Sequence, residues 1–345
     1  MKTLALARKG TVLALVALAA CADTTPVAPI ASPSSPARTA ASSAISDENV
    51  SVSPIFEGIN AQLAASGATV RAVQGELLMD ANGWDGVSST IIIANDRSRG
   101  IGAEWVKGDP RRSGRTGLTY AVGSNRASQP VTRDPDGTNL RLVSFAQLDT
   151  QLEEGMSAWR ARSCSSSPIA RVPVPAGTDP DFLDEFFRGL PTSVNYSQPA
   201  DIVQAGWQPS QFFRNIAGPS GNNIIGVTFT FIFVDGNGVP TDIDRNGRYD
   251  TALAEIFYNT RFAWGSNAAA NVIDFYSVIT HETGHALGLG HFGKVFVTKK
   301  GAADGIQIAD IKYAPYALMN AVYVTGRNEL AGTDNSSFCQ LWAGR

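Results

Sequence analysis

Every histidine of this 345-residue chain lies within residues 281–291, which read His-Glu-Thr-Gly-His-Ala-Leu-Gly-Leu-Gly-His. Side chains four positions apart share one face of a helix, so His281 and His285 can point both imidazoles at one metal ion. Gly288 can adopt the positive φ that ends a helix and turns the chain back, which brings His291 to the same point. Three nitrogen ligands leave a fourth position open to water, the arrangement of a catalytic rather than a structural zinc site.

Glu282 follows the first candidate ligand and can serve as general base toward water at the metal. The pattern H-E-x-x-H-x-x-G-x-x-H resembles the zinc-binding motif of the metzincin metallopeptidases. The resemblance implies an α+β zincin fold: a twisted mixed β-sheet with long helices, one of which carries the motif. It also implies a zinc-dependent endopeptidase acting on protein or peptide substrates. We expect one zinc ion per chain, because no fourth histidine exists for a second histidine-based site.

Two other interpretations of the motif stay open. An amphipathic helix could carry incidental histidines, although a chain that used histidine for ordinary purposes would place some elsewhere. The chain could also be a catalytically quiet surface lipoprotein that uses the fold as a binding module. The presence of Glu282 argues against the second interpretation, since a binding module has no need of that carboxylate.

A short turn after the motif extends the resemblance. Residues 316–320 read Tyr-Ala-Leu-Met-Asn and resemble the Met-turn of metzincins, in which the methionine lies beneath the metal; the alternative is that Met319 is an ordinary core residue. Ala321 stands where astacin-like members have a tyrosine, and Phe292 where they have a glutamate. Both differences favour a matrixin-like member of the family.

A second metal-binding pattern occurs upstream of the histidines. Asp242, Asp244, Asn246 and Asp250 place oxygen ligands at positions 1, 3, 5 and 9 of a calcium-type loop. Leu253 occupies position 12, so the bidentate glutamate of a complete EF-hand is missing. Calcium binding and a plain polar turn between strands both stay open as interpretations.

The N-terminus has the features of an export signal. Positive residues near the start precede a short apolar stretch that ends in Leu-Ala-Ala-Cys at Cys21. Residues 1–20 resemble a bacterial lipoprotein signal peptide, with Cys21 as the lipidated residue; the alternative is an ordinary signal peptide cut near Ala20. Residues 21–54 are rich in Ser, Thr, Ala and Pro and are expected to form a disordered tether. We therefore expect an exported cell-envelope lipoprotein, held at the membrane by its lipid anchor only, or a secreted protein if Cys21 is not lipidated.

Charge and cysteine content add further limits. The formal net charge is −3, and loss of Lys2, Arg8 and Lys9 with the signal segment would make it more negative, so nucleic acid is not an expected partner. We expect a monomer. Cys164 and Cys339 are the cysteines left after Cys21, and in an exported protein they favour a disulfide over two free thiols.

Two regions follow the tether. Residues 55–114 are expected to form a small β-rich segment of unknown role, and residues 115–345 the metzincin-like catalytic domain. The loop at 109–115 holds three arginines and is expected to be a solvated surface loop, with a nicking site as the alternative. Substrate is expected to lie along an edge strand at residues 255–259. Helices are predicted at 56–65, 145–162 and about 271–288, and strands at 69–78, 89–94, 103–106, 118–122, 169–174, 224–234 and 255–259.

Overall fold

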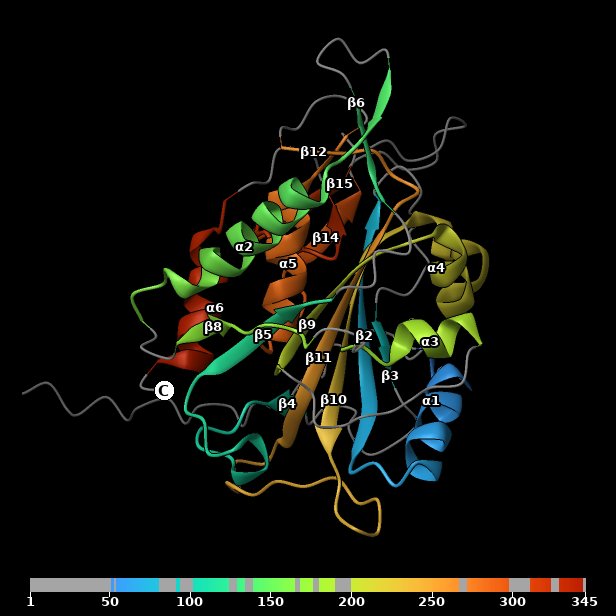
Figure 1. Ribbon diagram of the computed structural model, residues 1–345. Helices are drawn as coiled ribbons and strands as arrows, with labels where there is room; N and C mark the ends of the chain where they lie inside the picture. The colour runs from blue at the N-terminus through green and yellow to red at the C-terminus, as the bar shows by residue number, and fades with distance from the viewer. Residues whose placement is uncertain are drawn as a thin grey trace, which may run out of the picture. The chain divides into compact units, whose positions relative to one another are not determined.

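The structure is a computed structural model (Figure 1). It describes residues 51–52, 54–80, 91–93, 102–123, 129–133, 139–164, 168–175, 180–189, 200–266, 272–297, 311–323 and 329–343. The expected signal peptide, Cys21 and nearly all of the tether lie outside these residues. Residues Ile45–Arg345 form one compact unit, so the boundary expected near residue 115 does not separate two bodies in this structure.

A mixed β-sheet runs through the centre of this unit. Eight of its strands follow one path, and two more attach to it. The path is β1 (Ser51–Val52), β3 (Ile91–Ile93), β2 (Val70–Asp80), β10 (Ile224–Phe233), β11 (Tyr249–Asn259), β9 (Ile202–Gln208), β5 (Leu118–Val122) and β8 (Ile169–Arg171). The attached strands are β16 (Val322–Tyr323), which pairs with β2, and β4 (Ala103–Glu104), which pairs with β11.

Strand direction divides the sheet into two parts. From β11 through β9 and β5 to β8 the neighbouring strands are parallel. β10 is antiparallel to both of its neighbours, β11 and β2. Three two-stranded sheets lie apart: β12 (Trp264–Gly265) with β13 (Ile273–Asp274), β14 (Lys294–Val297) with β15 (Ile311–Ala314), and β6 (Val131–Arg133) with β7 (Leu140–Leu142).

Helices cover both faces of the central sheet, which makes this an α/β arrangement rather than the expected α+β one (Figure 1). α2 (Phe145–Arg160), α5 (Phe275–Ala286) and α6 (Gly332–Trp342) lie on one face. On the other lie α1 (Pro54–Ala65), α3 (Leu183–Arg188) and α4 (Ser210–Ala217). Two short 3-10 helices, Pro110–Arg112 and Gly218–Asn223, complete the described helices.

Two apolar cores fill the space between the sheet and these helices. β10 contributes to both cores, because its pairing with β2 is irregular between Ile224 and Gly226 and the side chains change face there. Val227, Phe229 and Phe231 join the core beneath α1, α3 and α4, whereas Ile225 joins the core beneath α2 and α5. The expected strand at 224–234, buried on both faces, is confirmed.

The structure corrects the expectation that residues 255–259 form an edge strand. These residues form the end of β11, which pairs with β10 on one side and with β9 on the other. Its backbone groups are already used within the sheet, so an extended substrate cannot add to it. The internal position of β11 results from pairing with distant segments, which the local sequence does not indicate.

The segment at 55–114 is built into the sheet rather than standing beside it. β2 is eleven residues long and lies between β3 and β10, and Phe56 of α1 packs edge-on against Phe229 of β10 with ring centroids 6.2 Å apart. The sheet of the chain is therefore completed by its N-terminal segment.

The disulfide suggested by the sequence is present between Cys164 and Cys339, whose Cα atoms lie 5.4 Å apart. It joins the chain just after α2 to the middle of α6. Such a bond is typical of an oxidising compartment outside the cytosol. Among the described helices, none combines the length and apolar character that crossing a bilayer requires.

Candidate metal centre

The three histidines come from one helix and the turn that follows it. Asp274 caps α5 by accepting a 2.7 Å hydrogen bond from the Ser277 amide. His281 and His285 lie one turn apart on this helix, which ends at Ala286. Gly288 then adopts a φ of 94°, in the left-handed region that favours glycine. His291 follows this turn, so the three histidines do not share one helix.

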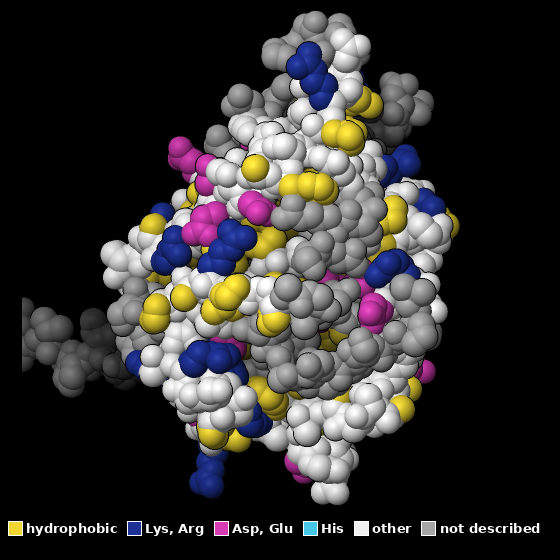
Figure 2. Space-filling view, viewed as in Figure 1, with side chains coloured by type: hydrophobic (Ala, Val, Ile, Leu, Met, Phe, Trp, Pro, Cys, Tyr) yellow, Lys and Arg dark blue, Asp and Glu magenta, His cyan; other side chains and the backbone are white. Residues whose placement is uncertain are grey.

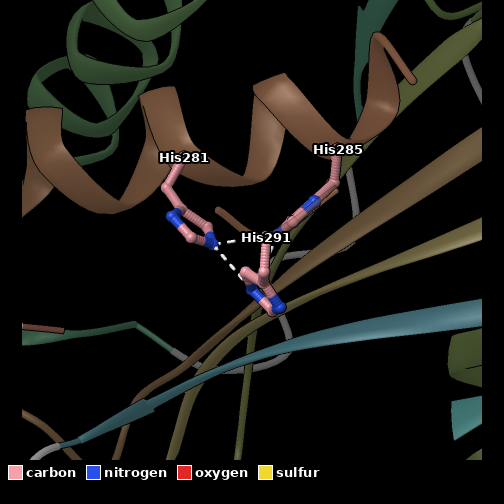
Figure 3. A group of neighbouring side chains, drawn as sticks. All are labelled: His281, His285 and His291. Carbon is pink, nitrogen blue, oxygen red and sulfur yellow. Dashed lines mark hydrogen bonds between the residues drawn. The ribbon is translucent and has the colours of Figure 1, made fainter. Parts of the chain in front are cut away.

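The imidazoles converge on one point between α5 and the sheet (Figure 3). The Nε2 atom of His285 lies 2.9 Å from that of His281 and 3.2 Å from that of His291, and the remaining Nε2 pair is 3.3 Å apart. His281 Nδ1 lies 2.8 Å from the carbonyl oxygen of Leu318, and His285 Nδ1 lies 2.7 Å from that of Leu289. A ring nitrogen that faces a carbonyl carries the hydrogen, so the Nε2 lone pairs of these two rings face the shared point.

This arrangement fits a metal ion. Burial lowers the pKa of His285 and of His291 well below the usual value, and the neighbouring His281 lowers both further. The two rings are therefore neutral near pH 7, the form that binds metal. Converging lone pairs repel one another unless a cation lies between them. His281 and His285 are buried and His291 is half-buried, and no histidine is seen among the coloured residues of the face in Figure 2.

The turn at 316–320 lies directly against the ligand helix. Met319 is fully buried, and a Cβ atom added to Gly284 of α5 would lie 2.5 Å from its sulfur. Glycine at 284 is thus what allows the methionine to lie so close. Asp334 of α6 fixes the turn by accepting hydrogen bonds from the Leu318 and Met319 amides at 2.8 and 3.1 Å.

The carboxyl of Glu282 points from α5 toward β10. Thr228 Oγ1 donates a 2.6 Å hydrogen bond to Glu282 Oε2, and Glu282 Oε1 is buried without a hydrogen-bond partner in the described part of the chain. A Cβ at Gly226 would lie 2.6 Å from Oε1, so glycine leaves room for the carboxyl. Burial raises the Glu282 pKa well above its usual value, and the nearby Glu76 adds to this rise.

Glu76 is a site residue that sequence reasoning missed. It lies on β2, is 4% exposed, and places Oε2 3.1 Å from His285 Nδ1 and 3.4 Å from His291 Nδ1. Burial raises the pKa of Glu76 to about 8, against a lowering by its hydrogen bond from Gln74. A cavity of about 200 Å³ borders Glu76 and His285 and is also lined by Trp105 and Arg248. The signal in the sequence was an acid within a predicted strand, directly before the apolar residues Leu77 and Leu78.

The candidate calcium loop forms a compact polar turn. Oxygen atoms of Asp242, Asp244 and Asp250 lie within 4.8 Å of one another. Asp242 accepts hydrogen bonds from the Asn246 and Gly247 amides at 3.0 and 2.9 Å, as a polar turn requires. Asp250 is fully buried and already pairs with Arg111 at 2.7 Å. The arginine competes with a cation for this carboxylate, and calcium binding stays a prediction.

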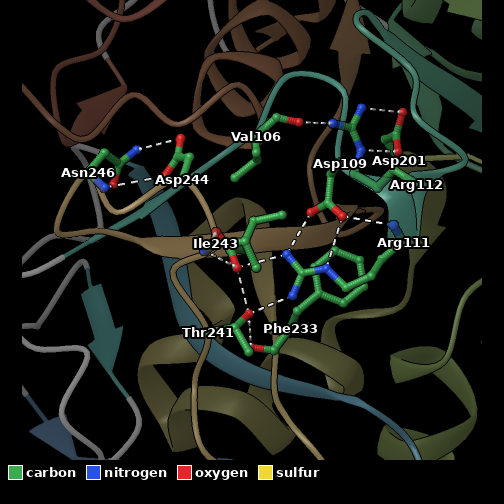
Figure 4. A network of polar contacts seen from close by, with 11 residues as sticks. Val106, Asp109, Arg111, Arg112, Asp201, Phe233, Thr241, Ile243, Asp244 and Asn246 are labelled. Atoms are coloured by element: carbon green, nitrogen blue, oxygen red, sulfur yellow. Dashed lines mark hydrogen bonds and ion pairs between the residues drawn. The ribbon is translucent and has the colours of Figure 1, made fainter.

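The arginine loop at 109–115 is only in part the solvated surface loop that the sequence predicts. Arg112 is buried and forms a bidentate pair with Asp201 at 2.8 and 3.1 Å (Figure 4). Arg115 reaches the same carboxylate at 3.0 Å, while Arg111 joins Asp250 to Asp109. Pro110, Arg111, Ser113 and Gly114 are exposed, as expected of a surface loop, but the ion pairs also anchor the loop to the fold. Asp201 and Asp250 lie too far along the chain for local sequence to indicate these pairs.

Comparison with known proteins adds no identification. No protein-family model matches the chain, and no curated protein matches it. Its function must therefore be inferred from the geometry of the site.

Proposed function

We propose that this protein is a zinc-dependent endopeptidase whose catalytic site resembles that of matrixin-like metzincins. One observation carries the proposal: three histidine Nε2 atoms meet within 3.3 Å of one another. His281 and His285 turn their Nδ1 atoms to carbonyl oxygens, which fixes the ring orientation that metal binding needs. The first two ligands, the glycine turn and the third ligand follow the spacing of the motif.

Zinc held by these residues would supply a Lewis acid and would lower the pKa of water to about 7. Glu282 is the residue that moves protons. Glu282 directly follows the first candidate ligand on α5, so its carboxyl suits removal of a proton from the attacking water and its return to the leaving amine. Thr228 holds the carboxyl through Oε2, which leaves Oε1 for this transfer.

The zinc-site residues also support the finer assignment to a metzincin-like fold. Met319 lies buried against Gly284 in the last turn of the ligand helix, as the family resemblance implies for a Met-turn. The route of the substrate is not the one expected from sequence, because β11 is internal to the sheet and the outer side of β10 is paired with β2.

A second candidate is a catalytically quiet binding protein with the same metal centre. The observation that favours it is the complete burial of Glu282 together with the covering of β10 by β2. Under either function, the proposed setting is the cell envelope, with lipid attachment at Cys21 and the Cys164–Cys339 disulfide formed after export.

The test is cleavage of an unfolded protein by the purified chain and by a Glu282→Gln variant that keeps the shape of the side chain. Endopeptidase function predicts cleavage by the wild type and a loss of at least about a hundredfold in the variant, with zinc content unchanged. Glu57→Gln, on the exposed face of α1, serves as the matched control. Equal cleavage by wild type and Glu282→Gln would refute the proposed role of Glu282, and no cleavage by either would favour the binding protein.

A further inference from the structure

The three ligand histidines differ in what faces the outer ring nitrogen. His281 and His285 each place Nδ1 within 2.8 Å of a backbone carbonyl oxygen. Among the described residues, no carbonyl oxygen accepts a hydrogen bond from His291 Nδ1. The group that faces this atom is the carboxyl of Glu76, with Oε2 3.4 Å away. Both atoms are buried, and neither has a hydrogen-bond partner in the described part of the chain. A donor and an acceptor thus face each other a few tenths of an ångström beyond hydrogen-bonding distance.

Glu76 is held in place for this contact. Its neighbour on the same strand face, Gln74, donates a hydrogen bond to Oε1, which leaves Oε2 toward the histidines. His285 Nδ1 is also 3.1 Å from Oε2, but its hydrogen is directed to the nearer Leu289 carbonyl at 2.7 Å. Glu76 Oε2 can therefore accept the hydrogen on His291 Nδ1.

The strand that carries Glu76 is fixed along both edges near the site. Glu76 lies opposite Thr228 in the β2–β10 pairing, and Thr228 is the residue that holds Glu282. A little further along β2, Met79 and Asp80 pair with the short strand β16. β16 follows the turn that contains Met319. The carboxylate thus belongs to the same rigid framework as the ligand helix and its supporting turn.

A purely structural role gives no reason for a carboxylate here. Burying a charged group costs free energy unless it is paired, and Leu77 and Leu78 beside it show that this strand accepts apolar residues. The cost is offset when the neighbouring imidazole is bound to a cation, because its Nδ1 hydrogen then becomes a stronger donor and the site gains positive charge.

We propose that Glu76 is a positioning residue of the metal centre, which accepts the Nδ1 hydrogen of His291 and thereby orients the third zinc ligand. The inference rests on the proposed zinc function. A carboxylate partner of this kind fixes the tautomer and orientation of a ligand histidine and raises its basicity. It follows that the segment at 55–114 completes the metal centre, and that removing this segment would damage the site rather than uncover it.

The test is zinc affinity, measured by competition with a chromogenic chelator, for the full chain and for Glu76→Gln and Glu76→Leu. Glu57→Gln, an exposed acid of α1, is the control for loss of one negative charge. We expect the zinc dissociation constant to rise about 10- to 100-fold in both Glu76 variants and to stay unchanged in the control. Each protein should still bind one zinc ion, and the visible absorption of the cobalt-substituted variants should differ from that of the wild type because His291 is reoriented.

Urea unfolding of the metal-free proteins shows whether Glu76 positions His291 or stabilises the fold. Removing an unpaired buried carboxylate should leave the metal-free unfolding midpoint equal or higher. A lower urea midpoint of the metal-free Glu76 variants, together with weaker zinc binding, would overturn the inference. Unchanged zinc affinity and cobalt spectra in Glu76→Gln would also overturn it. If the wild type itself bound no zinc, the proposed function would fail first and the inference with it.

Discussion

Thr228 of β10 donates a 2.6 Å hydrogen bond to Glu282 of α5, and it also lies 3.0 Å from the Glu282 backbone carbonyl oxygen. One hydroxyl thus connects the central sheet to the residue that we assign to proton transfer. The contact is fully buried on both sides. This hydrogen bond ties the Glu282 carboxyl to β10, where Thr228 lies opposite Glu76 of β2.

Replacing Thr228 with valine keeps the branched shape and removes the hydroxyl. We expect the free energy of unfolding to fall by about 1–3 kcal/mol, because the Glu282 carboxyl loses its hydrogen-bond donor inside the protein. Cleavage should fall about tenfold or more if Glu282 needs this contact for its orientation. Urea unfolding and peptide cleavage measure the two effects. Thr230→Val on the same strand is the control, and an equal loss in both variants would contradict the role of Thr228.

Gly284→Ala tests the close packing of Met319 against the ligand helix. The added Cβ would lie 2.5 Å from the methionine sulfur and 3.0 Å from the Trp159 ring. Overpacking of this kind costs about 1–3 kcal/mol, and we expect weaker zinc binding as α5 shifts. Gly332→Ala in α6, where no atom lies within 4 Å of the new Cβ, should change neither quantity. Normal stability and affinity of Gly284→Ala would show that Met319 does not pack as described.

The buried carboxyl of Glu76 predicts a pH dependence of the metal-free protein. Its pKa is raised from 4.5 to about 8, so the folded state binds the proton more tightly than the unfolded state does. The stabilisation is complete below pH 4.5 and is lost as the pH rises to about 8. At about 1.4 kcal/mol per pKa unit, the loss is at most about 5 kcal/mol.

Unfolding of the wild type and of Glu76→Gln in chelator across this range measures the effect. The wild type should lose stability more steeply with rising pH than the variant, since glutamine has no proton to release. Lowered pKa values of His285 and His291 act in the opposite sense: their contribution is complete above pH 6.5 and declines in acid. Identical slopes for the two proteins would contradict the burial of Glu76.

Much of the site could be predicted from local sequence, because its parts are close together in the chain. The spacing of His281, His285 and His291 and the position of Gly288 were enough to predict the helix, its end and the convergence of the rings. β10 was predictable because nearly all of its residues are β-branched or aromatic. These features depend on periodicity and on a single turn.

Other parts depend on contacts between distant segments. β9 was not predicted, because Gln204 and Gln208 interrupt its apolar pattern; in the structure both are buried, and Gln204 accepts a 2.7 Å hydrogen bond from Tyr258. The internal position of β11 and the approach of Glu76 to the histidines come from strand pairing, which has no local signature. Glu76 in particular could have been singled out as an acid among apolar strand residues, but not assigned to the metal centre.

The disulfide between Cys164 and Cys339 predicts a stability that depends on redox conditions. It spans 175 residues of chain, so it restricts the unfolded state strongly. A Cys164→Ser/Cys339→Ser double variant should lose about 3–5 kcal/mol of unfolding free energy, and reduction of the wild type should have a similar effect. Thermal unfolding with and without reductant measures this, and a melting temperature insensitive to both changes would contradict it.

The most direct test of the zinc peptidase is removal and return of the metal in the purified full-length protein. Metal content and cleavage of an unfolded protein are measured before chelation, after it, and after addition of one equivalent of zinc. We predict one zinc per chain, loss of cleavage on removal and its recovery on return, with neither binding nor recovery in His285→Ala. Cleavage that survives complete removal of zinc, or zinc binding that survives in His285→Ala, would contradict the assignment.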